Sequence, residues 1–338
     1  MKKWFLMALL VPVMMACGNR NERLLTSATG SIYECLVVSN HVVKDAVCET
    51  MGADMYGLPQ MEAIFTVTHV TANQFDDFFK STRNILIVDI DEHKYTQLKA
   101  NRSRDVWSKP QAVVRIQAPS DEAFLEYWNE NGETIREWFV REEFARQLRF
   151  YRANTNKEAR EILNKQGYDI LIPEDFVLVK SEKLIVDNKD IDVVWCCNNK
   201  GPMRKDILVY SYPYTAQEQF SNDSIIAVRN EVMGRLVSAQ VAGSHMGTEY
   251  KHFPPVSRQV AALRDTVGGF YAIETRGLWK ILDGEAMGGP FVSLTRLDQV
   301  NARVVTAETF LFAPGQKKRN AMRQCEAILY SLAMPNER

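Results

Sequence analysis

The feature that most constrains the fold is a pattern that occurs three times along the chain. Each time, three short strand-like runs are followed by a proline and then by a stretch with helical periodicity. The runs of the last set lie at 269–282, 290–297 and 303–312, and the helical stretches of the three sets lie at 133–152, 224–239 and 316–333. Strands joined by short turns and covered by helices on one face predict an α+β fold with mainly antiparallel sheets. The three sets are candidates for repeated βββα units, and convergent packing of unrelated segments is the alternative.

The length of 338 residues is enough for two domains, at roughly 100–200 residues each. We expect an N-terminal α+β lobe at 31–170 and a C-terminal α+β lobe at 171–338. A hydrophobic content of 46% predicts well-filled cores. A doubly wound parallel sheet would need strict alternation of strands and helices, whereas residues 277–297 have the pattern of a hairpin.

The helical stretches also predict which side chains face solvent. In 133–152 the large apolar residues fall near one face. The other face carries two oppositely charged pairs at a spacing of four, Glu137–Arg141 and Glu142–Arg146, which are expected to be solvated. Residues 256–266 follow two prolines and place apolar residues on one stripe, which predicts a connecting helix.

The N-terminus has the features of an export signal. Lys2 and Lys3 precede thirteen uncharged residues, too few for a membrane-spanning helix of ~20 residues but the right number for the apolar region of a signal peptide. The small Ala16 directly before Cys17 resembles the lipobox of bacterial lipoproteins, in which the chain is cut before the cysteine and its thiol is acylated. We therefore predict a lipoprotein signal peptide at 1–16 and a lipid, including palmitate-type acyl chains, on Cys17.

The residues after the predicted cleavage site indicate the cellular location. Residues 18–30 are polar and without periodicity, so 17–30 is interpreted as a tether that extends at most ~45 Å from the membrane. Gly18, instead of an aspartate that would resemble the retention signal of the inner membrane, favours the outer membrane. The tether lacks a run of acidic residues such as surface-exported lipoproteins carry, so the periplasmic face is expected.

These features together resemble a known family. The lipobox-type start, a mature length above 300 residues and the segment "RGLWKILDGEAMGGPFVS" are similar to an uncharacterised family of Bacteroidetes lipoproteins, known only as a domain of unknown function. The resemblance implies membrane attachment and no described catalytic site. It transfers no functional residue other than Cys17.

Charge and motifs exclude several classes of function. Removing Lys2 and Lys3 from 41 basic residues leaves 39 against 42 acidic ones, and no basic stripe indicates nucleic-acid binding. The glycine motifs of nucleotide-binding loops do not occur, and no cofactor is expected. His245, Glu249 and His252 have a spacing that could bind zinc on a helix, but the glycines and prolines around them favour a loop, and we predict no metal site.

The cysteines other than Cys17 are expected to be buried thiols. Cys35 and Cys48 could form a disulfide if a helix at 40–50 packed beside a strand at 33–38, but a chain of this length does not depend on disulfides for its stability.

The hairpin offers the most distinctive candidate for a ligand site. Arg276 and Trp279 precede a tip that contains Gly288 and Gly289. In a ligand-facing loop, the tryptophan would stack on the ligand, the arginine would bind an anion, and the glycines would permit close approach of the backbone. The preferred interpretation is a tight turn with a core tryptophan.

Two short motifs suggest O-glycosylation. Ser224 and Thr266 each lie between an aspartate and an aliphatic residue, which resembles the acceptor motif of Bacteroidetes envelope proteins. For the first motif, a helix cap is the alternative.

For function, we expect a membrane-anchored lipoprotein of the cell envelope that binds a partner protein or polymer without catalysis. The alternatives are a lipoprotein that binds a glycan or small ligand, and an unrecognised hydrolase. The hydrolase would need a cleft with two carboxylates ~5–9 Å apart.

Overall fold

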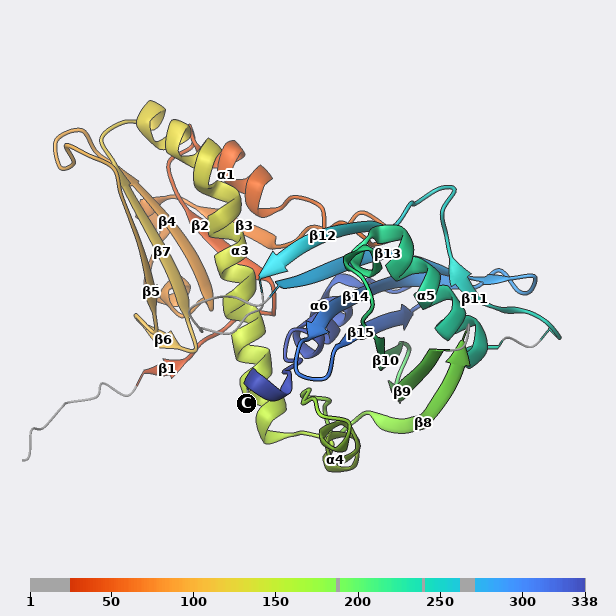
Figure 1. Cartoon of the computed structure of the whole chain (residues 1–338). Helices are drawn as coiled ribbons and strands as arrows, with labels where there is room; N and C mark the ends of the chain where they lie inside the picture. Colours follow the sequence, from red (N-terminus) through yellow and green to blue (C-terminus); the bar gives the residue numbers. More distant parts are fainter. Residues whose placement is uncertain (1–24, 187–188, 239–240, 262–270, 338) are drawn as a thin grey trace, which may run out of the picture.

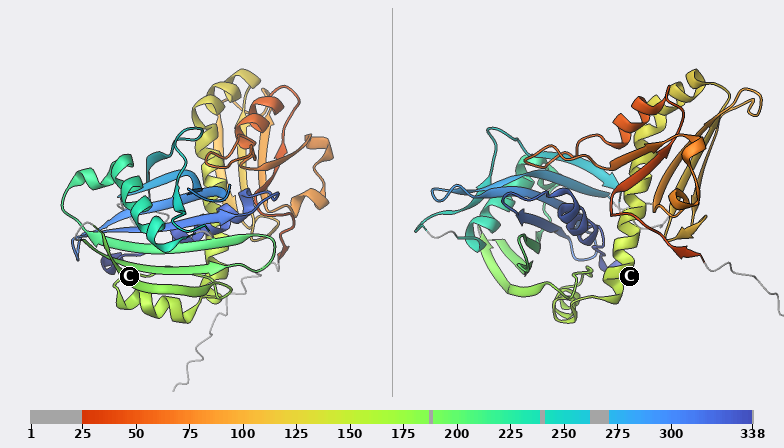
Figure 2. Two further views of the ribbon diagram at one scale, coloured as in Figure 1. Left: turned by 90° about the vertical axis from the view of Figure 1, so that its right-hand side faces the viewer. Right: turned by 180° about the vertical axis from the view of Figure 1, so that it is seen from behind.

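The computed structural model describes residues 25–186, 189–238, 241–261 and 271–337. It confirms the α+β class with mainly antiparallel strand pairing, which comes from the sheet of the C-terminal lobe, whereas most pairs of the N-terminal sheet are parallel. Two lobes lie side by side, each built on one sheet, and the long helix α3 (Asp121–Ala153) runs between them (Figures 1 and 2).

The C-terminal lobe contains an eight-stranded antiparallel sheet in the order β11-β13-β14-β15-β10-β9-β8, with β12 also pairing with β13. The strands are β8 (Val177–Val186), β9 (Lys189–Asn198), β10 (Arg204–Pro213), β11 (His245–Thr248), β12 (Val256–Ala261), β13 (Tyr271–Leu282), β14 (Gly288–Asp298) and β15 (Arg303–Phe312). The helices are α4 (Lys157–Lys165), α5 (Asn222–Leu236) and α6 (Arg319–Leu329). The predicted hairpin is confirmed as β13 and β14, paired from Ala272–Arg296 to Lys280–Gly288.

The N-terminal lobe contains a five-stranded sheet in the order β3-β2-β4-β7-β5, in which only the β5–β7 pair is antiparallel. Its strands are β2 (Glu34–Val38), β3 (Thr66–Val70), β4 (Asn84–Ile90), β5 (Lys99–Arg104) and β7 (Ala112–Ala118), and the short strands β1 (Thr26–Ser27) and β6 (Ser108–Lys109) pair with each other. Helices α1 (Lys44–Met51) and α2 (Asp77–Lys80) complete the lobe. The first of the three strand sets, at 63–68, 85–90 and 112–117, falls on β3, β4 and β7, of which β4 and β7 pair in parallel, so the structure does not confirm repeated βββα units.

Two local predictions are wrong. Residues 256–261 form strand β12 instead of the start of a helix, and the rest of the stretch 256–266 lies outside the described residues. The charged pairs of α3 are also arranged differently, because Glu142 and Arg146 are buried and each binds another partner. The helix itself begins at Asp121, where the hydroxyl of Ser120 accepts a hydrogen bond from the amide of Ala123 and caps it.

Helices cover both faces of the C-terminal sheet. On one face, α6 and α3 enclose a core that continues into the N-terminal lobe and contains buried residues from Tyr33 to Met334. On the other face, α5 covers a second core around Trp279, Phe291 and Phe310. The lobes therefore share one apolar core, which fixes α6 and β13 against α3. Within the described part of the chain, no helix is long and apolar enough to cross a membrane.

Candidate functional site

The hairpin residues singled out from the sequence are not brought together on one surface. Trp279 is buried in the core beneath α5, and its indole Nε1 donates a hydrogen bond to the carbonyl of Leu311 at 3.0 Å. Arg276 lies three residues earlier on the strand, and its side chain reaches the opposite face of the sheet, where it contacts α6. Both side chains are engaged with neighbouring protein groups.

The glycines at the start of β14 permit close packing of the backbone. A Cβ on Gly289 would lie 2.1 Å from the carbonyl oxygen of Leu311, and one on Gly288 would lie 2.7 Å from that of Trp279. Only glycine fits at such distances. Their role in the described structure is therefore packing within the sheet.

Of the three residues predicted to be modified, Ser224 lies within the described structure. Ser224 lies half-buried in the first turn of α5, and its hydroxyl accepts a hydrogen bond from that of Ser221, which also caps the helix. Cys17 and Thr266 lie outside the described residues. Cys35 and Cys48 are free thiols, and burial raises the pKa of both.

Arg276 is the centre of a chain of ion pairs that we call the charge ladder: Arg258, Glu274, Arg276, Glu326 and Arg323. Glu274 binds Arg258 and Arg276, each through a guanidinium Nε at 2.8 Å. Arg276 also binds Glu326 at 2.7 Å, and Glu326 binds Arg323 at 2.9 Å. The ladder joins β12, β13 and α6, and its three inner groups, Glu274, Arg276 and Glu326, are buried. It alternates in sign and has an arginine at each end.

A pocket of about 250 Å³ lies where the two ends of the ladder meet α3, between the lobes. Its charged lining comes from Arg258, Glu274 and Arg323 of the ladder and from Arg136, Glu137 and Arg141 of α3. Its apolar lining comes from Ile64, Val140, Phe144 and Val260, and Tyr330 and Gln259 complete it. Pockets at the junction of domains are common ligand sites.

Glu274 is not suited to acid catalysis in this pocket. Burial alone would raise its pKa, but the Arg276 and Arg258 guanidinium groups hold the pKa well below its usual range. The Tyr330 hydroxyl donates a further hydrogen bond to the same carboxylate at 2.7 Å. A carboxylate bound by three donors stays ionised and has little freedom to accept a proton, so the pocket does not resemble the acid pair of a hydrolase.

A second hollow, of about 320 Å³, lies at the end of the C-terminal sheet opposite the tip of the β13–β14 hairpin, where β10 and β14 end and β13 begins. It is lined by the aromatic rings of Tyr214, Phe220 and Tyr271, with Phe220 5.9 Å from Tyr271 and 6.2 Å from Tyr214 between ring centroids. Tyr271 is about half exposed, at 49%. Gln217 and Gln299 add amide groups to the rim. We call this the aromatic hollow.

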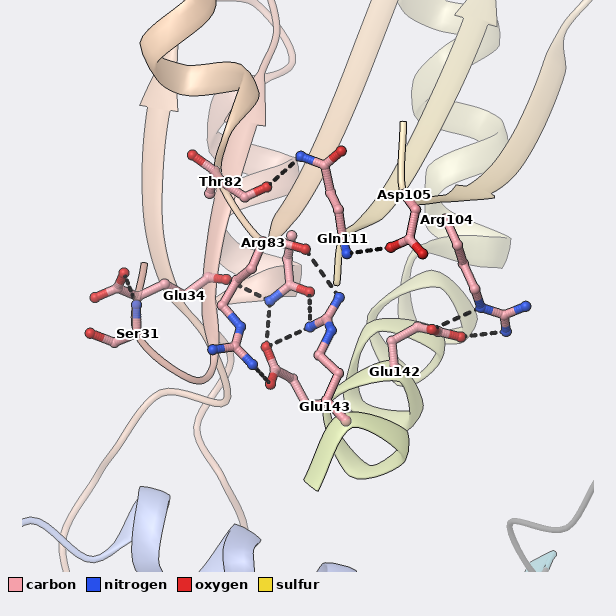
Figure 3. Close-up of polar contacts among 11 residues, drawn as sticks. Ser31, Glu34, Thr82, Arg83, Arg104, Asp105, Gln111, Glu142 and Glu143 are labelled. Atoms are coloured by element: carbon pink, nitrogen blue, oxygen red, sulfur yellow. Dashed lines mark hydrogen bonds and ion pairs between the residues drawn. The ribbon is translucent and has the colours of Figure 1, made fainter. Parts of the chain in front are cut away.

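A separate polar cluster, between α3 and the N-terminal sheet, has a structural role. In Figure 3, Glu143 of α3 accepts hydrogen bonds from Arg83 at 2.7 Å, Asn84 at 2.7 Å and Arg146 at 2.9 Å. Glu142 binds Arg104 of β5 through both carboxylate oxygens. These contacts hold α3 against the ends of the N-terminal strands, and no pocket described here opens onto them. Among the described residues, no group of three or more histidine, cysteine, aspartate and glutamate side chains is arranged to hold a metal ion.

The sequence alone predicted neither the pocket between the lobes nor the aromatic hollow. Only fragments of the charge ladder show a local signal: Glu274 and Arg276 alternate on a strand, and Arg323 and Glu326 are three apart on a helix. Arg258 lay in a segment interpreted as a helix.

Comparison with known proteins supports the expectation of an uncharacterised family. Residues 154–331 match the family model described as Domain of unknown function (DUF4837), and residues 28–152 match the one described as Domain of unknown function (DUF8532). No curated protein sequence matches the chain. Among solved structures, the chain is similar to the solution structure of cyanobacterial PsbP (CyanoP) from Synechocystis sp. PCC 6803, with 11% identity, 50% of this chain and 88% of that chain covered, and a TM-score of 0.33. A similarity of this size supports no argument about fold or function.

Proposed function

The chain belongs to the family described as Domain of unknown function (DUF4837), and we propose that it is a lipoprotein of the cell envelope that binds a glycan through its folded part. In this proposal Cys17 carries the lipid, the outer membrane holds the anchor, and the folded lobes face the periplasm. The chain acts by binding and not by catalysis.

The anchor is supported by the N-terminal sequence. One acyl chain gives only marginal attachment, with an association constant of about 10⁴ M⁻¹, whereas several chains make it effectively permanent. The tether then keeps the folded lobes within ~45 Å of the bilayer.

The observation that carries the binding function is the aromatic hollow. Its three rings offer apolar faces to a sugar ring, and the exposed Tyr271 gives a ligand access from solvent. Amide groups such as those of Gln217 and Gln299 both donate and accept hydrogen bonds, as sugar hydroxyls require. Arg296 and Glu337 also line the hollow, but they bind each other, so these two charges cancel. Apolar walls with a few polar groups that fix orientation are the composition expected for a neutral, polyhydroxylated ligand.

The anchor is tested by membrane fractionation of Cys17→Ala, with Cys48→Ala as the matched control. We expect the first variant to be released from membranes or to remain uncleaved, and the second to behave like the wild type. Unchanged attachment of Cys17→Ala would reject lipidation. Protease added to intact cells should spare the wild type, and rapid digestion would overturn the periplasmic assignment alone.

Glycan binding is tested with the purified lipidated chain in detergent, titrated with soluble peptidoglycan fragments and with oligosaccharides released from lipopolysaccharide. Loss of one stacking ring is worth about 0.5–1.5 kcal/mol, so Tyr271→Ala should weaken binding up to about tenfold. The control is Tyr250→Ala, which removes a similarly exposed tyrosine outside the hollow. Equal binding by both variants and the wild type would reject the aromatic hollow as the glycan site.

A further inference from the structure

The charge ladder carries more positive than negative charge, and its excess lies at the pocket between the lobes. Three arginines alternate with two glutamates, so each glutamate is neutralised and one positive charge remains. The two terminal arginines, Arg258 and Arg323, both line the pocket. Helix α3 adds Arg136 and Arg141 on the facing wall, against the single carboxylate of Glu137. The lining as a whole therefore has four arginines and two glutamates.

Arg323 gives an independent indication of a missing acceptor. Its side chain is only 9% exposed, and its Nη1 donates to Glu326 at 2.9 Å. Its Nε is buried, and no group in the described residues accepts a hydrogen bond from it. A buried donor without an acceptor is unfavourable, and a rotation of the Arg323 side chain that brought its Nε to an oxygen atom in the pocket would remove this cost.

Helix α3 provides a second arginine, besides Arg323, that could bind a ligand in the pocket. Arg136 is committed, because its Nη1 donates to the carbonyl of Thr50 at 2.9 Å. Arg141 is exposed and makes no hydrogen bond or ion pair with the described residues. Arg141 and Arg258, which is 57% exposed in its side chain, can therefore reorient toward a ligand without breaking the buried part of the ladder.

The remaining walls are apolar. Ile64, Val140 and Phe144 line the side of the pocket formed by the N-terminal lobe and α3, and Val260 lines the side formed by β12. A bare inorganic ion would leave these surfaces in contact with water, whereas a ligand with a small hydrocarbon part would cover them. The volume of about 250 Å³ fits a molecule of that size.

We propose that this pocket binds a small organic oxyanion, whose carboxylate or phosphate group is held by Arg323, Arg258 and Arg141 and whose apolar part contacts Val140 and Phe144. Planar guanidinium groups bind both oxyanions in a bidentate manner. The site uses residues from both lobes and none of the aromatic hollow, so it does not depend on the proposed glycan binding.

Isothermal titration calorimetry of the purified full chain tests the proposal, with acetate, benzoate, inorganic phosphate and phenyl phosphate as probes at constant ionic strength. We expect benzoate to bind more tightly than acetate, and phenyl phosphate more tightly than phosphate, each at least about fivefold because of the apolar walls. A titration with sodium chloride should give no heat of binding. Failure of all four probes to bind above this control would overturn the site, and equal affinities within each pair would overturn the organic character of the ligand.

Two variants locate the binding. Arg258→Gln should weaken phenyl phosphate binding about tenfold or more, since it removes a charged donor. Arg141→Gln, which changes an exposed residue outside the ladder, should weaken it severalfold and leave the thermal midpoint unchanged. Arg152→Gln is the matched control, because it removes an exposed arginine of the same helix away from the pocket. If Arg141→Gln binds as tightly as Arg152→Gln, the pocket is not the binding site.

Discussion

The buried ion pair between α5 and the C-terminal sheet gives a sharp test of the packing energetics. Arg229 of α5 and Glu308 of β15 are both fully buried, with Nη2 and Oε1 2.8 Å apart. The Arg229 guanidinium also lies over the Phe291 ring, with Cζ 3.8 Å from its centroid, and donates to the hydroxyl of Thr248 at 3.0 Å. Burial raises the pKa of Glu308 to about 7, although Arg229 opposes the rise.

We predict that Arg229→Met destabilises the protein by about 3–5 kcal/mol at about pH 8, because it leaves the Glu308 carboxylate buried without a counter-ion. The cost should be smaller at lower pH. Without Arg229 the folded-state pKa of Glu308 moves above 7, so the carboxyl group can take up a proton and become neutral.

The sign and size follow from proton linkage. Between about pH 4.5 and the folded-state pKa of about 7, Glu308 binds more protons in the folded wild type than in the unfolded chain. The free energy of unfolding therefore falls as the pH rises through that window. The loss ends near pH 7. In Arg229→Met the loss continues above pH 7. At about 1.4 kcal/mol for each pH unit, the penalty of the variant should be at least about 1 kcal/mol larger at pH 8 than at pH 5.5.

The measurement is urea unfolding of the wild type and the variants at both pH values. Glu308→Gln is the control, because the arginine that it leaves buried cannot lose its proton, and its cost should be nearly independent of pH. The double variant Arg229→Met/Glu308→Leu should recover most of the stability, since apolar residues of similar volume often replace a buried pair without loss. A cost of Arg229→Met that is equal at both pH values, or larger at pH 5.5, would refute this account.

Further predictions concern packing and modification. Gly289→Ala should lower the free energy of unfolding by more than about 2 kcal/mol, measured by thermal or urea unfolding, because its Cβ would lie 2.1 Å from the backbone carbonyl oxygen of Leu311. The control Gly201→Ala has open space around it and a φ of +84°, and should lower it by only about 1 kcal/mol. Glu143→Ala should destabilise by about 3–5 kcal/mol in urea unfolding because it leaves two arginines without their shared carboxylate, and a cost below 1 kcal/mol would contradict that role. If Ser224 carries an O-glycan, Ser224→Ala should lower the intact mass of the mature chain by a glycan, and a wild-type mass equal to that of the unglycosylated lipoprotein would exclude the modification.

Much of the C-terminal lobe could be predicted from its sequence. The runs at 269–282, 290–297 and 303–312 correspond closely to β13, β14 and β15, because long strands with β-branched residues and short turns give a strong local pattern. The antiparallel pairing followed from the short connections, since a tight turn returns the chain beside the strand that it leaves.

The N-terminal pairing was not predictable in the same way. The runs that became β4 and β7 have the same local composition as antiparallel strands, but residues 91–111 separate them along the chain. Such a long connection permits either direction, and the choice depends on tertiary packing against α3. Strand β12 was missed because apolar residues four apart, as at Val256 and Val260, fit one face of a helix and also the period of two of a strand.

The polar sites were the least predictable, because their partners are distant in sequence. A charged residue on a helix is solvated by default, and nothing local marks Glu143 as the shared acceptor of Arg83, 60 residues away. The ladder poses the same problem on a larger scale: Arg276 and Glu326 are 50 residues apart and become neighbours only when α6 packs on the sheet. The sequence-based interpretation of Arg276 as an anion-binding residue identified the right chemistry, but its guanidinium binds two buried glutamates of the protein itself.

The shared core explains why a charged pocket can persist between the lobes. Buried apolar residues from both family segments pack around α3 and α6, so the N-terminal and C-terminal lobes are held in contact beside the pocket. The hydrophobic contact is not directional and sets only the proximity of the lobes. The charge ladder then fixes the relative orientation of β12, β13 and α6, because Glu274 and Glu326 each bind two of the three arginines that alternate with them. An odd number of groups that begins and ends with arginine cannot neutralise itself, so the same contacts that join β12, β13 and α6 leave positive charge where the lobes meet.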